Sequence, residues 1–103
     1  MNNNEAGDAD IIKMLNSETG KISWEELQPH FARGVVVKVD PSLDLLHVAL
    51  EFVKDNKDRV STWLETGKME KVTDKQAKIW SRENPVLWSV VAAPWVLVQT
   101  LKQ

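Results

Sequence analysis

Apolar residues are most concentrated near the C-terminus, in residues 86–101 (VLWSVVAAPWVLVQTL). This segment has no charged residue and holds two of the five tryptophans, Trp88 and Trp95. A segment this apolar needs cover on both faces, so we expect it to form the innermost part of the core. Two short helices are an alternative, but the many β-branched residues favour a strand that is bent or bulged at Pro94.

Two further segments are predicted strands. Residues 34–40 carry four valines in five positions between Gly34 and Asp40-Pro41, and three consecutive valines favour a central place in a sheet. Residues 69–72 are a shorter candidate, whose charges at Glu70 and Lys71 are typical of an edge strand.

The remaining apolar residues follow helical spacing between recognisable start and stop signals. Ser23 and Glu26 have the spacing of a capping box, in which each side chain satisfies a free backbone N–H of the first helical turn. Asp40-Pro41 is a second predicted helix start. The expected helices cover residues 10–17, 24–33, 41–55, 57–66 and 74–83, with a kink or a new turn at Pro29.

These elements predict an α+β fold in which four or five short helices pack on a small sheet of two or three strands, at about residues 34–40, 69–72 and 87–99. The length of 103 residues fits one domain. We expect this single globular domain over residues 10–103, preceded by a disordered polar tail over residues 1–9.

Composition narrows the function classes. The net charge is −2, so we expect no nucleic-acid partner, because such proteins usually carry a basic surface. The absence of cysteine excludes disulfides, thiolate nucleophiles and cysteine-based zinc sites. No segment predicts a membrane span, and the acidic, polar N-terminus lacks the pattern of a signal peptide, so we expect a cytoplasmic protein.

Four segments together show a likeness to a known family: ISWEELQPHFARGVV, VDPSLDLLHVA, WLETG and LWSVVAAPWVLVQ. Over about residues 15–99 the chain resembles a small bacterial family called domain of unknown function 2288. The resemblance implies a bacterial, cytoplasmic protein. Because the family is uncharacterised, it implies no catalytic residue, cofactor or partner.

One group of side chains could suit a metal ion. Asp44, His47 and Glu51 stand at positions i, i+3 and i+7 of a predicted helix and so share one face. A carboxylate, imidazole, carboxylate set is chemically suitable for a transition metal. We favour the interpretation that these three side chains form the solvent-exposed polar face of an amphipathic helix. We therefore expect neither a metal nor a cofactor.

His30 and Arg33 lie in the segment PHFARG, where the chain turns from a helix into a strand. A catalytic His30 would need an orienting acid and a substrate pocket, and neither is visible in the sequence. No nucleophile, phosphate-loop or dinucleotide motif is present. A small enzyme or metal-binding protein that uses His30 or the Asp44, His47 and Glu51 face is therefore the alternative hypothesis, and a weak nucleic-acid binder is the third.

The tryptophans either fill the core or form an interaction surface. On an uninterrupted strand Trp88 and Trp95 would face opposite sides, so one of them could lie exposed. The leading hypothesis is a non-enzymatic protein that acts through protein–protein contacts or homodimerisation. We expect contacts through Trp88, Trp95, His30 and Arg33, or by strand pairing beside residues 35–39 or 88–98.

Overall fold

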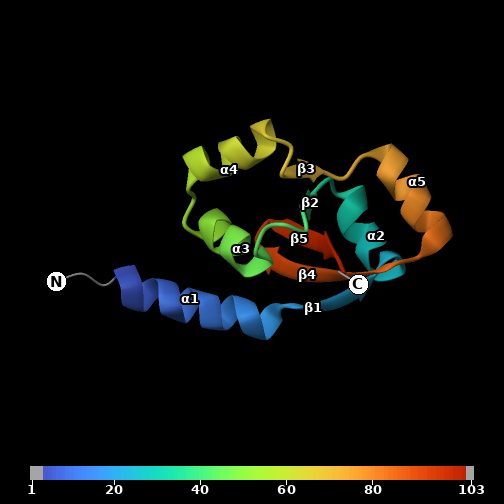
Figure 1. The fold of residues 1–103 in the computed structure, drawn as a ribbon. Coiled ribbons are helices and arrows are strands. Elements are labelled where there is room, and N and C mark those ends of the chain that lie inside the picture. Colours follow the sequence, from blue (N-terminus) through green and yellow to red (C-terminus); the bar gives the residue numbers. More distant parts are fainter. Residues whose placement is uncertain (1–3, 102–103) are drawn as a thin grey trace.

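The computed structural model describes residues 4–101, and their side chains from residue 7 onward. This part of the chain forms five helices and one five-stranded mixed sheet (Figure 1). The helices are α1 (Asn4–Glu18), α2 (Trp24–Ala32), α3 (Leu45–Val53), α4 (Lys57–Glu65) and α5 (Asp74–Glu83). The strands are β1 (Gly20–Ser23), β2 (Val36–Val39), β3 (Met69–Lys71), β4 (Val86–Ala92) and β5 (Trp95–Thr100). The predicted α+β class is confirmed, but the predicted sheet of two or three strands is too small.

The strands are ordered β1-β4-β5-β2-β3, with β2 and β5 parallel and the other neighbours antiparallel. The apolar strands β2, β4 and β5 are thus paired on both sides. The sheet ends at the short strands β1 and β3, which carry the charged residues Lys21, Glu70 and Lys71. Short, charged edges discourage pairing with another chain. Within residues 4–101, the predicted strand pairing beside residues 35–39 or 88–98 therefore has no free strand edge to use, while contacts through Trp88, Trp95, His30 and Arg33 stay a prediction.

The helices cover both faces of the sheet (Figure 1). We call the side covered by α1, α3 and α4 the α3 face, and the side covered by α2 and α5 the α2 face. Each face has its own core. The core of the α3 face includes Leu15, Val48, Trp63, Val90 and Leu97. The core of the α2 face includes Trp24, Leu27, Trp80, Leu87 and Val98.

The C-terminal apolar run is two strands and not one bent strand. β4 and β5 form an antiparallel hairpin in which Ala92 pairs with Trp95, so the chain reverses at Ala93 and Pro94. Proline cannot donate a ladder hydrogen bond and is favoured in turns, which explains why the reversal lies here. The reversal also removes Trp95 from the predicted innermost position, because it leaves this side chain at the end of the sheet and only partly buried.

Two other element boundaries differ from the prediction. Helix α1 begins at Asn4 and not at Asp10, so residues 4–9 of the predicted tail are helical, while residues 1–3 lie outside the described residues. Helix α3 begins at Leu45, because the Asp44 side chain accepts the Leu46 N–H as the N-cap. The Asp40 carboxylate accepts the Ser42 N–H instead, and this local turn delays the helix. Strand β1 has no counterpart in the prediction.

The signals around α2 are confirmed. The Ser23 hydroxyl accepts the Glu26 N–H at 3.2 Å, and the Glu26 carboxylate accepts the Ser23 N–H at 3.1 Å. The helix continues through Pro29 to Ala32, so the predicted alternative of a new turn at Pro29 is wrong. It is followed by Gly34 with φ of 74°, a left-handed conformation in which glycine has no steric penalty.

Candidate functional site

The structure gives Asp44, His47 and Glu51 separate roles. Asp44 caps α3 through the Leu46 N–H. The buried Glu51 carboxylate accepts a hydrogen bond of 2.7 Å from Asn56 Nδ2 and lies 3.8 Å from His47 Nε2. Within residues 4–101, no group of three His, Asp or Glu side chains is arranged to hold a metal ion.

We therefore expect Zn²⁺, Mn²⁺ and Ni²⁺ to leave the melting temperature unchanged. An ion that binds only the folded protein must stabilise it, so thermal melts with and without each metal measure binding directly. A stabilisation that disappears in His47→Ala would contradict this prediction and restore the metal hypothesis.

His30 and Arg33 form a local pair at the end of α2. Arg33 Nη2 lies 2.6 Å from His30 Nδ1. A guanidinium group can only donate hydrogen bonds, so the Nδ1 atom is the acceptor in this contact. No acidic side chain is hydrogen-bonded to His30 within the described part of the chain. The pair serves as a contact at the helix end and lacks the orienting acid of a catalytic histidine.

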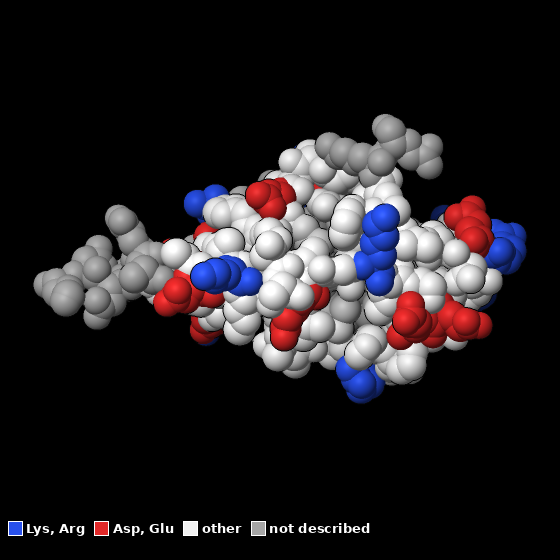
Figure 2. Space-filling view, turned by 90° about the horizontal axis from the view of Figure 1, so that it is seen from below, with Lys and Arg blue, Asp and Glu red and all other residues white. Residues whose placement is uncertain are grey.

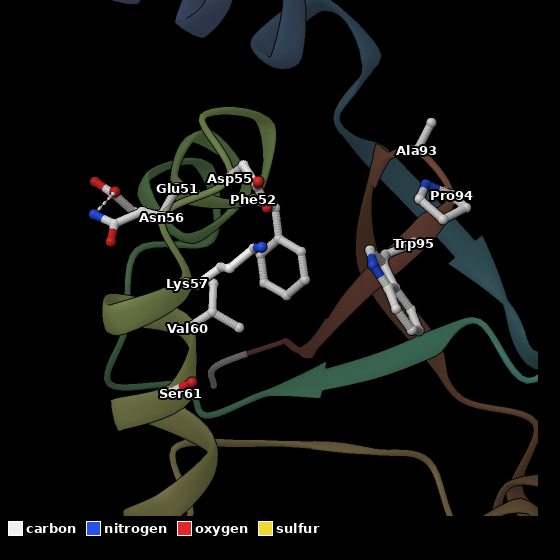
Figure 3. Close-up of a pocket in the computed structure, with 10 residues that line it drawn as sticks. All are labelled: Glu51, Phe52, Asp55, Asn56, Lys57, Val60, Ser61, Ala93, Pro94 and Trp95. Carbon is white, nitrogen blue, oxygen red and sulfur yellow. Dashed lines mark hydrogen bonds between the residues drawn. The ribbon is translucent and has the colours of Figure 1, made fainter.

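Trp95 lines a cleft between two turns of the chain (Figure 3). The α3–α4 turn supplies one wall and the β4–β5 turn supplies the other. The cleft has a volume of about 500 Å³, and its lining includes Phe52, Asp55, Lys57, Val60, Pro94 and Trp95. In Figure 3, Phe52, Lys57 and Val60 lie opposite the indole of Trp95.

Trp88 lies near the other end of β4, where it contributes to a second hollow of about 370 Å³. Its side chain is 38% exposed, a high fraction for tryptophan. We define the Trp88 surface as Asn16, Thr19, Lys21, Leu43, Asp44, Leu46, Trp88 and Gln99.

The sheet and one loop fix the geometry of the Trp88 surface. Lys21 on β1 and Gln99 on β5 are the cross-strand neighbours of Trp88, so all three side chains lie on the α3 face. Lys21 Nζ is 5.5 Å from the centre of the indole ring, within cation–π distance. Gln99 Nε2 donates to the carbonyl oxygens of Asp40 and Leu43 at 2.9 and 2.8 Å, which holds the loop before α3 beside Trp88.

The side of the molecule that carries α1 and β1 shows mostly uncharged atoms, with the charged side chains in separate groups (Figure 2). Two more large apolar side chains, Val86 on β4 and Met14 on α1, are about half exposed. Val86 is two residues from Trp88 on the same strand, so both side chains lie on the α3 face of the sheet.

The sequence analysis named Trp88 and Trp95 but not the residues that meet them. Phe52, Lys57 and Val60 face Trp95 only because the α3–α4 turn lies beside the β4–β5 hairpin (Figure 3). Leu43 and Leu46 reach Trp88 only because the loop before α3 is fastened to β5. The periodicity of one segment carries no information about such contacts between segments.

None of the helices within residues 4–101 is both long and apolar enough to cross a lipid bilayer.

Comparison with known proteins identifies the family. The model of a family described as "Protein of unknown function (DUF2288)" matches residues 10–100. The solution NMR structure of PA1075 from Pseudomonas aeruginosa is similar to this fold, with a TM-score of 0.79 and 42% sequence identity, over 91% of this chain and 87% of that chain. No curated protein matches. The resemblance found in the sequence is thus confirmed, and the chain belongs to the DUF2288 family.

Proposed function

We propose that this protein acts without catalysis, through protein–protein contacts, and that the Trp88 surface binds a second copy of the chain. The observation that carries the proposal is the exposed indole of Trp88 beside Leu43 and Leu46. Tryptophan is enriched among the residues that dominate binding energy at protein interfaces. Burying this side chain and its apolar neighbours against a partner would remove apolar surface from water.

The structure of the sheet favours a contact through its α3 face, where Trp88 lies, and disfavours a contact through its edge strands. Strand β1 has only four residues and β3 only three, and both carry charged side chains. A partner strand could form few hydrogen bonds there. The Trp88 surface lies on the α3 face and needs no backbone pairing.

The charges of the Trp88 surface favour an identical partner. Lys21 lies over the indole ring, and the exposed Asp44 lines the same hollow as Trp88. In a two-fold symmetric dimer, the same surface patch of each copy faces the other copy. A residue pair that meets across such an interface therefore occurs twice, with the two residues exchanged between the copies. A surface with one base and one acid can thus place Lys21 of each copy near Asp44 of the other.

Light scattering over a dilution series tests this proposal. We expect the apparent mass of the unaltered protein to rise with concentration toward twice the mass of one chain. Trp88→Lys should remain monomeric at the same concentrations, because a charge would have to be buried at the centre of the contact.

Val91→Lys is the matched control. Val91 is also on β4 and is 46% exposed, but it points to the opposite face of the sheet. This variant should associate like the unaltered protein. A mass equal to one chain at every concentration, or equal loss of association in both variants, would refute the contact through Trp88.

A further inference from the structure

We propose that the cleft between the α3–α4 turn and the β4–β5 turn binds a small organic acid with a flat apolar ring. This site is separate from the Trp88 surface, because Trp88 and the β4–β5 turn lie toward opposite ends of β4. The volume of about 500 Å³ falls in the usual range of small-molecule sites, about 300–1,000 Å³.

The walls of the cleft suit a flat ring. Phe52 and Val60 on one side face the indole of Trp95 on the other, with Pro94 beside it (Figure 3). Aromatic side chains bind flat apolar groups by stacking and edge contacts, and they also remove apolar ligand surface from water. Phe52, Val60 and Trp95 are each partly buried, so these side chains are held by the core while part of their surface stays open.

The charge of the cleft favours an acid over an amine. The side chain of Lys57, the first residue of α4, extends into the cleft and forms no hydrogen bond or ion pair with the described residues (Figure 3). The positive end of the α4 dipole lies at the same place. Lys71 Nζ lies 5.7 Å from the centre of the Trp95 ring, so one cation already occupies a cation–π position there.

The two carboxylates at the cleft do not reverse this preference. The Glu51 carboxylate is held by Asn56 Nδ2, and Figure 3 shows this pair turned away from Trp95. Asp55 is exposed and is placed by a positive φ of 56° at the end of α3. Water therefore screens the negative charge of Asp55 more than it would screen a buried charge. The side chain of Lys57, in contrast, can reach a ligand that lies between the two walls of the cleft.

Calorimetric titration with 1-naphthoate tests the proposal, and the neutral 1-naphthamide serves as the comparison ligand. We expect saturable 1:1 binding of naphthoate with a Kd below about 1 mM, and weaker binding of the amide. Lys57→Gln should weaken naphthoate binding about tenfold. A tenfold change in Kd corresponds to the free energy of about one hydrogen bond to a charged group. Because Lys57 is exposed, this variant should keep the melting temperature of the unaltered protein.

The control is Lys78→Gln, since Lys78 is an exposed lysine of α5 on the other side of the sheet. It should bind naphthoate as the unaltered protein does. The proposal is overturned if naphthoate binds with a Kd above about 1 mM, or if Lys57→Gln and Lys78→Gln bind it equally. Equal affinity for the acid and the amide would likewise overturn the role of charge.

Discussion

Replacing Trp24 by alanine is expected to lower the free energy of unfolding by about 3–5 kcal/mol. Trp24 is 4% exposed, and its ring lies 5.6 Å from those of Phe31 and Trp80, measured between ring centres. Trp24 of α2 contacts Trp80 and Ser81 of α5, so its removal leaves a cavity among large side chains where the two helices meet. Chemical denaturation measures this loss, which is a large share of the total of about 5–15 kcal/mol usual for a domain.

Ser81→Ala provides the control for Trp24. The Trp24 indole N–H donates a hydrogen bond of 3.0 Å to the Ser81 hydroxyl, so this variant removes the bond and keeps the ring. We expect a loss of only about 1–2 kcal/mol. If Trp24→Ala costs no more than Ser81→Ala, the indole does not hold α2 and α5 together as described.

Leu97→Ala is expected to cost about 2–5 kcal/mol. Leu97 lies on the central strand β5, between Val90 on β4 and Val37 on β2, and has no exposed surface. It faces the core of the α3 face, where α3 packs on the sheet. The truncation therefore opens a cavity at a place that neighbouring strands cannot easily close.

Leu64→Ala is the matched substitution on the surface. Leu64 belongs to α4 and is 48% exposed, so its removal should change the free energy of unfolding by less than about 1 kcal/mol. Similar losses for the two leucines would contradict the central position of β5 and the two-sided core of the sheet.

The helices were the most predictable part of the fold because their signals are local. The Ser23–Glu26 capping box and Gly34 define the ends of α2 by contacts within a few residues. The valines of β2 and the charged strand β3 were also identified. Asp40 and Asp44 are both good helix caps, and only the turn to Ser42 decides that Asp44 is used.

The sheet was less predictable because its signals depend on distant partners. In residues 86–101 almost every position is apolar, so no change of pattern marks the reversal between β4 and β5, and Pro94 alone indicates it. Strand β1 has one large apolar residue, Ile22, which is too little for a period-two pattern. It is a strand because β4 lies beside it.

The candidate sites were predicted only through their tryptophans. The composition of the chain singles out Trp88 and Trp95 as large aromatic residues in one apolar segment. Their neighbours are Leu43, from the loop before α3, and Lys57, the first residue of α4, and only the folded chain brings them to the tryptophans. The family resemblance identified the DUF2288 family and supplied no site.

Self-association through Trp88 is tested most directly by two-dimensional NMR spectra recorded over a dilution series from millimolar to micromolar protein. We expect the indole N–H signal of Trp88 and the amide signals of Lys21 and Leu46 to shift with concentration, because these groups lie at the contact. The indole signal of Trp24, which is buried and bonded to Ser81, should not shift. Spectra that do not change with concentration, or changes confined to residues away from Trp88, would contradict the proposed interface.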